Sequence, residues 1–430
     1  MPSERPSHTS VPRVGVFHPG TQRFREVSVT LQEAGLLEWC ATGVYFKPDK
    51  WPYTLLGAMP GSLRQRFLRE LRKRRHDKLD DRLVLTNGKW EWALAVALRH
   101  PALARFQRTL MEHRNEAFGT WLSRHECMNR TDLVYGFNTC SVELFREAKA
   151  KGMPCVLDQT NPYAGFCARN WEEEAQRTPQ FGRAQMLRTA ATVRWYATRE
   201  QPELAMADAV VIGSRFAAET LGEAGVDLGK CRVVGNVATV PRVTYSPRPA
   251  GQRIRLLFAG VLNPMKGIYY LLEAMKRLDT TQVELLLVGR LDIPERALAP
   301  YRHLFTYIPQ VPREQLYKHY ANTDIFVLPT IHEGFARVLV EAAAMGCPIV
   351  TTTASGTDEL IGDEEAGYQI APRDIDGLAE KIDQLCGDRQ LREQMGRRAW
   401  ERAAQFTPER YAERLVSAVL GAWNDSRQLS

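Results

Sequence analysis

The sequence lacks long apolar runs and clustered cysteines, and each absence excludes a class of protein. No stretch reaches the ~20 apolar residues of a membrane-spanning helix, and the N-terminus lacks the apolar core of a signal peptide. The eight cysteines are scattered, with no CxxC pair, which argues against a zinc module or a disulfide framework. Scattered thiols are typical of a reducing compartment, so we expect a cytoplasmic protein.

The chain is long enough for two folding units. Its 430 residues exceed one ordinary hydrophobic core and suggest two domains of about 200 residues each. Short apolar segments alternate with helical patterns in both halves, which predicts an α/β fold with doubly wound parallel sheets. The predicted strands are 14–17, 83–85, 133–135, 155–157 and 209–212 in the first half, and 254–258, 283–288, 304–308, 325–328 and 348–351 in the second.

Prolines mark the boundary between the halves. They accumulate at Pro241, Pro247 and Pro249, just before a new apolar strand. We therefore predict an N-terminal domain over 1–245, a C-terminal domain over 252–405 and a final helical segment, 406–430, that crosses back to the first domain. Two such sheets in tandem would leave a ligand-binding cleft between their carboxyl edges.

The segment from Glu333 to Glu341 carries the strongest chemical signal. A loop with Glu333 and Gly334 follows a strand, and an apolar helix is predicted from about Phe335 to Met345. Free backbone N–H groups after Gly334, with the positive end of the helix dipole, favour binding of a diphosphate. Glu341 lies in an apolar run, where a carboxylate needs a partner, so a bound hydroxyl is expected. Alternatively, Glu333 caps the helix and Glu341 is solvated.

A second phosphate signal occurs at the turn after the strand 254–258. The turn begins with Gly260 and ends with Lys266 and Gly267, directly before a helical pattern. A lysine beside backbone N–H donors neutralises phosphate charge, although such a turn alone is weak evidence.

The order of these motifs resembles glycosyltransferase family 4, with its E-x7-E signature, over residues 254 to 416. The resemblance implies the GT-B fold, in which two Rossmann-like domains face a central cleft. It also implies that Glu341 holds the donor ribose, that Glu333 contacts the donor sugar and that Lys266 stabilises the departing diphosphate. Further donor contacts are implied for Gly334, Phe335, Ala336, Ile308 and Gly260.

One position departs from the family pattern. Val261 stands where relatives carry an arginine that stabilises the leaving group. Arg290 and Arg337 are candidates to replace it, and the alternative is that both are solvated surface residues.

The first half matches the family more loosely. Gly20 lies where relatives have a glycine-rich loop over the donor and acceptor. Asp158 ends a predicted strand, at a position that often carries a catalytic or acceptor-binding group, or it simply caps the following turn.

These observations together predict a retaining glycosyltransferase that uses a UDP-sugar or GDP-sugar donor. The acceptor would be a glycan or a lipid-linked glycan in cell-surface polysaccharide or glycolipid synthesis. No metal is expected, because Lys266 and the helix N-terminus supply positive charge. A catalytically weak GT-B subunit in an assembly or regulatory complex is the alternative, and Val261 favours it. The sugar, the base and the acceptor are left open.

Residues 61–78 hold eight basic residues against two acidic ones and place leucines and a phenylalanine at helical spacing. Such a helix can lie on an anionic membrane surface, here the inner face of the cell membrane. The alternative is a solvated helix packed on the N-terminal domain. No nucleic-acid module accompanies these charges.

Overall fold

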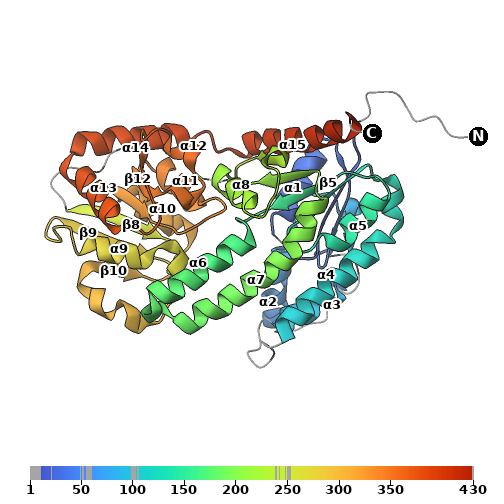
Figure 1. Ribbon diagram of the computed structural model, residues 1–430, viewed down its shortest axis with the longest axis horizontal. Coiled ribbons are helices and arrows are strands. Elements are labelled where there is room, and N and C mark those ends of the chain that lie inside the picture. The colour runs from blue at the N-terminus through green and yellow to red at the C-terminus, as the bar shows by residue number, and fades with distance from the viewer. Residues whose placement is uncertain are drawn as a thin grey trace, which may run out of the picture. The chain divides into compact units, whose positions relative to one another are not determined.

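The structure is a computed structural model (Figure 1). It describes residues 11–428 apart from 21, 49, 51–52, 55–60, 98–102, 104–105, 238–239, 242, 247 and 249–252. The chain divides into two compact units. Unit 1 holds the residues up to Gln159, then Arg199–Val211 and the chain from Arg414 on, and unit 2 holds Thr160–Thr198 and Ile212–Glu413.

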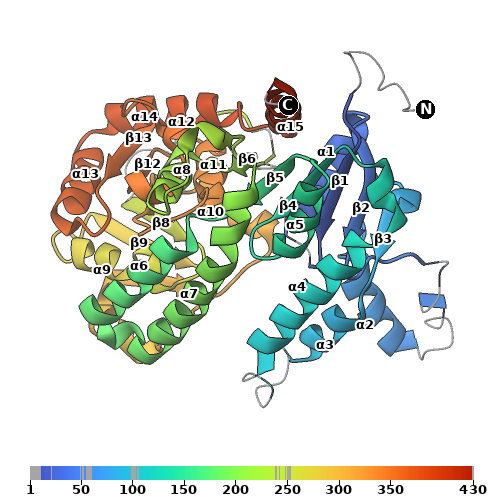
Figure 2. The ribbon, with the colours of Figure 1, turned by 45° about the vertical axis from the view of Figure 1, so that its right-hand side comes forward.

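The first sheet has seven strands in the order β3-β2-β1-β4-β5-β6-β7. The pairs from β3 to β5 are parallel, and β1, β4 and β5 are buried along their whole lengths. The strands are β1 Val14–His18, β2 Leu37–Thr42, β3 Val84–Thr86, β4 Leu133–Phe137, β5 Cys155–Gln159, β6 Ala209–Ile212 and β7 Cys231–Val233. Helices in unit 1 are α1 Phe24–Glu33, α2 Gly61–Arg72, α3 Lys89–Ala97, α4 Gln107–Ser123 and α5 Val142–Ala150, with α4 beside α5 (Figure 2).

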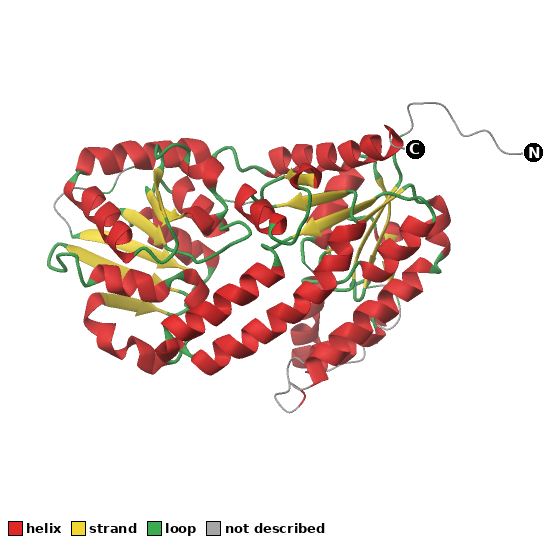
Figure 3. Ribbon diagram, viewed as in Figure 1, coloured by secondary structure: helices red, strands yellow, loops and turns green. Residues whose placement is uncertain are grey.

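The second sheet has six strands in the order β10-β9-β8-β11-β12-β13, and all its pairs are parallel. Helices flank this sheet (Figure 3), as expected for a doubly wound α/β fold. The strands are β8 Ile254–Ala259, β9 Val283–Val288, β10 Phe305–Ile308, β11 Ile325–Leu328, β12 Ile349–Thr352 and β13 Gly367–Ile370. The helices that follow in unit 2 are α8 Arg215–Gly222, α9 Ile268–Met275, α10 Arg313–Ala321, α11 Arg337–Ala344, α12 Asp358–Ile361, α13 Ile375–Gly387 and α14 Arg389–Ala403.

The units do not follow the predicted domain boundaries, because a helical hairpin from the first half of the chain packs with the second sheet. The hairpin consists of α6 (Ala164–Arg177) and the first part of α7 (Arg183–Met206). Phe181 and Met186 belong to the same buried core as the strands of the second sheet. Apolar burial therefore ties residues 160–198 to unit 2.

The last helix, α15 (Pro408–Gln428), begins inside the predicted helical segment 406–430. The hydroxyl of Thr407 accepts a hydrogen bond from the N–H of Arg410 at 3.2 Å, with Pro408 at the first helical position. From Arg414 on, α15 is assigned to unit 1.

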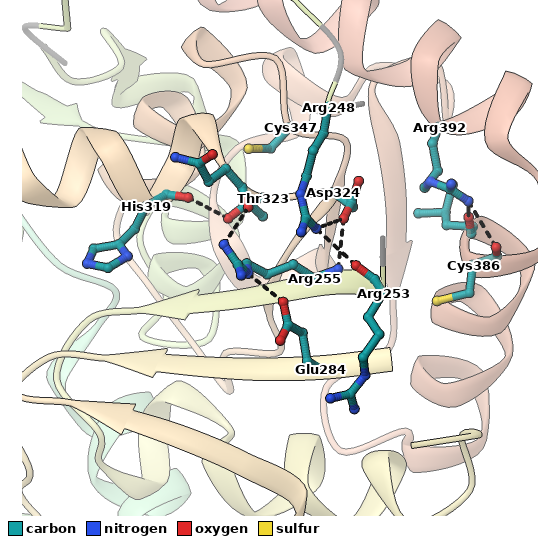
Figure 4. A network of polar contacts seen from close by, with 12 residues as sticks. Arg248, Arg253, Arg255, Glu284, His319, Thr323, Asp324, Cys347, Cys386 and Arg392 are labelled. Carbon is teal, nitrogen blue, oxygen red and sulfur yellow. Dashed lines mark hydrogen bonds and ion pairs between the residues drawn. The ribbon is translucent and has the colours of Figure 1, made fainter. Parts of the chain in front are cut away.

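A polar cluster joins the amino ends of the strands in the second sheet (Figure 4). The carboxylate of Asp324, before β11, forms an ion pair with Arg248, and the two side chains are only 14% and 9% exposed. The same carboxylate accepts the N–H of Arg255 at 2.8 Å, and the Arg255 guanidinium bonds Glu284 of β9 at 2.7 Å. This cluster fixes the chain that enters β8.

We predict that Asp324→Ala lowers the free energy of unfolding by about 3 kcal/mol, because it removes the carboxylate that pairs with the largely buried Arg248 guanidinium and accepts the N–H of Arg255. Urea unfolding followed by circular dichroism measures the loss. Asp376→Ala is the control, because Asp376 is 87% exposed and its ion pair with Arg277 should contribute less than about 1 kcal/mol. Equal losses in the two variants would contradict this account of the cluster.

Candidate functional site

The site lies at the carboxyl edge of the second sheet, between β8 and β11. These strands are hydrogen-bonded neighbours, and the chain proceeds outward from them in opposite directions, through β9 and β10 on one side and β12 and β13 on the other. Loops that leave such a switch point diverge and form the usual ligand crevice of an open α/β sheet.

Two hydrogen bonds tie the loop after β8 to the loop after β11. The carbonyl oxygen of Met265 accepts the N–H of Ile331 at 2.8 Å and the hydroxyl of Thr330 at 2.9 Å. Gly267 allows this close approach, because its φ is +72° and a Cβ there would lie 1.8 Å from the carbonyl oxygen of Pro329. The sequence therefore brings Lys266 and Glu333 to one place.

Lys266 forms an ion pair with Glu333, and the two side chains are 26% and 16% exposed. Burial removes water from the ammonium group and lowers the pKa of Lys266 to about 8. The Asn263 side chain accepts the backbone N–H of Lys266 at 3.0 Å and fixes the turn that carries it. A cation and a carboxylate are thus held together, ready to contact an anionic ligand and its hydroxyl groups.

The loop after Glu333 presents backbone donors. The N–H groups of Glu333 and Ala336 bond the carbonyl oxygens of Ala354 and Ser355, at 2.9 and 3.1 Å. The N–H groups of Gly334 and Phe335 have no acceptor within the described part of the chain. Helix α11 begins at Arg337, two residues later than predicted, so these donors belong to a loop before the helix.

Gly334 also contacts the start of the hairpin. A Cβ at Gly334 would lie 2.5 Å from the carbonyl oxygen of Thr160 and 3.2 Å from the Cα of Asn161. A side chain there would force the two segments apart, so the residues before α6 form one wall of the loop.

Glu341 lies on α11 and is 8% exposed. The sequence predicts a hydroxyl partner, and the structure places protein partners on this carboxylate. The Arg313 guanidinium bonds Oε1 at 2.8 Å, and the Tyr320 hydroxyl lies 3.4 Å from Oε2. Burial and the nearby carboxylate raise the pKa of Tyr320 well above its usual value, so its hydroxyl stays protonated.

The remaining predicted residues of the second half lie around this edge. Gly260 follows β8, and the carbonyl oxygen of Ile308, at the end of β10, accepts the N–H of Gly289 at 3.0 Å. Arg290 is 61% exposed, with Asp292 at 3.8 Å, and its carbonyl oxygen accepts the N–H of Leu262 at 2.9 Å. Arg290 is therefore next to the turn that contains Val261. The other candidate cation, Arg337, is exposed at the start of α11.

The two predicted residues of the first half, Gly20 and Asp158, belong to unit 1. Asp158 is fully buried, and its carboxylate accepts the Tyr135 hydroxyl at 2.7 Å and the Arg23 guanidinium at 2.6 Å. The N–H of Gly20 donates to Nδ1 of His18 at 2.9 Å, and burial lowers the pKa of His18 to about 3. Both residues therefore organise their own loops in unit 1.

A buried acid on α6 was not predicted from the sequence. Glu174 is fully buried and accepts Nε of Arg373 at 2.7 Å and the Tyr270 hydroxyl at 2.9 Å. Arg373 also bonds Asn170 at 2.8 Å. Nothing local in the sequence signals this cluster, because its members come from three separate elements.

His332, next to Glu333, was also missed. Burial and the charges of Lys266 and Arg373 lower its pKa to about 4, so its imidazole is neutral. Its Nδ1 lies 3.8 Å from the Sγ of Cys167 on α6. His332 therefore links the candidate site to the hairpin.

Two structural absences concern metals and membranes. Among the described side chains, no group of three or more His, Cys, Asp or Glu residues is arranged to hold a metal ion. Asp374 caps α13, and Asp376 forms an ion pair with Arg277. No described helix is long and apolar enough to cross a membrane.

Comparison with known proteins identifies the class. The crystal structure of HepE from Anabaena in complex with UDP matches this chain with a TM-score of 0.57 and 16% identity, over 95% of this chain and 100% of that one. Together with the two doubly wound sheets, this likeness places the chain in the GT-B fold class. Residues 246–402 match the family model of glycosyl transferases group 1.

The chain spans only part of the length of each of two curated relatives. The capsular polysaccharide biosynthesis glycosyltransferase CapM of Staphylococcus aureus is 33% identical over 148 residues, which is 32% of this chain and 38% of CapM. The D-inositol 3-phosphate glycosyltransferase of Paenarthrobacter aurescens is 28% identical over 259 residues, 52% of this chain and 62% of that protein. The chain thus matches less than two thirds of either relative.

We predict that Gly267→Ala destabilises unit 2 by about 2 kcal/mol more than Gly225→Ala. Both glycines have a positive φ, +72° and +76°, but an added Cβ at Gly225 meets nothing within 4 Å. The control therefore isolates the backbone cost, about 1 kcal/mol, from the collision with Pro329. Thermal unfolding of both variants measures the difference, and equal midpoints would contradict the close approach of the two loops.

Proposed function

We propose that this protein is a retaining glycosyltransferase that moves a hexose-type sugar from a nucleoside-diphosphate sugar to a glycan or lipid-linked acceptor. The observation that carries the proposal is the Lys266–Glu333 ion pair at the switch point of the second sheet, beside the N–H groups of Gly334 and Phe335. A cation and backbone donors suit a diphosphate, and a carboxylate suits the hydroxyl groups of a sugar.

The catalytic roles follow from this arrangement. Lys266 and the two N–H groups neutralise the charge that develops on the diphosphate as the bond to the sugar breaks. Glu333 orients the donor sugar, and the acceptor hydroxyl enters on the face from which the diphosphate leaves, so the anomeric configuration is retained. We propose that no metal takes part, since these groups supply the positive charge.

Arg290 is the residue we propose in place of the family arginine at Val261. Its backbone is hydrogen-bonded to Leu262, directly after Val261, and its side chain is 61% exposed. From there the guanidinium can turn toward a bound diphosphate without breaking a buried contact.

The relatives support polysaccharide or glycolipid synthesis as the biological setting. CapM is described as acting in capsular polysaccharide biosynthesis, and HepE was solved with UDP. We propose a UDP-sugar or GDP-sugar as the donor of this chain.

In unit 1, we propose that Asp158 acts by holding Arg23 in place at the acceptor side, because both of the carboxylate oxygens of Asp158 are already bonded.

The experiment that tests the function is release of nucleoside diphosphate from a panel of UDP- and GDP-sugars, with and without lipid extract. We expect turnover with at least one donor, and a loss of about 10²- to 10³-fold in kcat/KM for Lys266→Ala. Arg290→Ala should lose about tenfold, whereas Arg296→Ala, which changes a nearby exposed arginine, should lose nothing. Binding of sugar nucleotides without turnover of any would favour the inactive-subunit alternative.

The pH dependence of the same assay tests Lys266. Because its pKa in the free protein is about 8, the ammonium charge is present below pH 8 and is lost as the pH rises through that value. The value of kcat/KM should therefore fall above about pH 8. Lys266→Arg should move this fall to higher pH, since a guanidinium stays charged. A flat profile up to pH 9.5 in the unmodified protein would contradict this role.

We further propose that unit 1 docks on an anionic membrane surface. Five basic side chains in and after α2 are exposed, namely Arg64, Arg69, Arg72, Lys73 and Lys78. Trp90 and Trp92 of α3 are 39% and 41% exposed, and the Arg74 guanidinium lies over the Trp92 ring. Cations beside exposed tryptophans suit the headgroup region of a bilayer. The side chains of Leu63 and Phe67 lie outside the described residues.

Flotation with liposomes tests this docking. Neutralising Arg64, Arg69, Arg72 and Lys73 to glutamine should reduce binding to anionic vesicles at least tenfold, because each charge contributes up to about 1 kcal/mol near the surface. The matched control neutralises four exposed arginines of unit 2 and α15, namely Arg389, Arg397, Arg398 and Arg410. Equal binding of the two variants would refute docking through α2.

A further inference from the structure

Arg313 occupies an unexpected place beside the candidate ribose ligand. It is the first residue of α10. Its guanidinium bonds Oε1 of Glu341 at 2.8 Å and lies over the ring of Tyr317, with 5.6 Å to the ring centroid. The side chain is 52% exposed, whereas that of Glu341 is 10% exposed. Arg313 therefore approaches a nearly buried carboxylate from its open side.

The carboxylate needs such a neighbour. Glu341 is flanked on α11 by Val340 and Ala342, both fully buried, and a carboxylate in such surroundings needs hydrogen-bonding partners. An ionised carboxylate has about four acceptor positions on its two oxygens, whereas the neutral acid gives up one of them to its own proton. The two carboxylate oxygens of Glu341 suit the two hydroxyl groups of a ribose.

The remaining acceptor positions are available in this arrangement. Arg313 uses one position on Oε1, and the Tyr320 hydroxyl lies 3.4 Å from Oε2, well beyond the ~2.7 Å of a strong O–H···O bond. By the number of its acceptor positions, the carboxylate can bind ribose hydroxyls in addition to the guanidinium.

We infer that Arg313 is a positioning residue for the donor nucleotide: it holds the Glu341 carboxylate in the orientation that accepts the ribose hydroxyls. This inference rests on the proposed function, since it presumes that a nucleoside diphosphate binds here. The opposite role for Arg313 is competition with the ligand. A guanidinium that only blocked the carboxylate would compete with the ribose for it.

The test compares two ligands that differ only in the ribose hydroxyls. Binding of UDP and of 2′,3′-dideoxyuridine diphosphate to the full chain is measured by calorimetry, for the unmodified protein and for Arg313→Gln. We expect Arg313→Gln to weaken UDP binding about tenfold and to leave the dideoxy analogue unchanged. Arg313→Lys should restore most of the UDP affinity, because it returns the charge.

The outcomes separate this inference from the proposed function. If neither UDP nor GDP binds the unmodified protein, the donor site itself is wrong. If UDP binds and Arg313→Gln weakens both ligands equally, the residue is only structural, and tighter binding of UDP would show competition. Equal weakening of the two ligands overturns the inference, and so does tighter binding of UDP. Glu341→Gln provides the coupling check, because adding Arg313→Gln to it should cause no further loss of UDP affinity.

Discussion

The parallel pairing of β8 with β11 is the constraint on which the candidate site depends. It places the loops after the two strands side by side, and the hydrogen bonds to Met265 then fix their spacing. The Lys266–Glu333 ion pair follows from this spacing, and so does the position of the N–H groups of Gly334 and Phe335 beside it. Changes elsewhere in unit 2 should affect the site to the extent that they disturb this strand pair.

Apolar runs and turn residues were enough to predict most of the fold. The predicted bounds of the strands at 209–212, 283–288 and 325–328 match β6, β9 and β11. Three strands were missed, β2, β7 and β13. β2 and β13 contain polar residues such as Glu38 and Gln369, and β7 has only three residues with none buried, so none of them forms a continuous apolar run. Domain membership was harder to predict, because α6 joins unit 2 through side chains that only the tertiary structure brings together.

The same limit applies to the site. Lys266, Glu333 and Gly334 could be proposed from the sequence because they lie in short motifs, which specify their own turns. Arg313, His332 and Arg373 could not, because their importance comes from partners distant in sequence. Asp158 is the converse case. Its place at the end of a strand was predicted, but its two carboxylate oxygens are bonded to Tyr135 and Arg23, so its effect on a ligand would pass through these two residues.

The most direct test of the central claim, a donor site built on Lys266 and Glu333, is a crystal structure of the protein with UDP. We predict the diphosphate within hydrogen-bonding distance of Lys266 Nζ and of the N–H groups of Gly334 and Phe335, with the ribose at Glu341. A nucleotide bound elsewhere, with the Lys266–Glu333 ion pair still closed, would contradict the account.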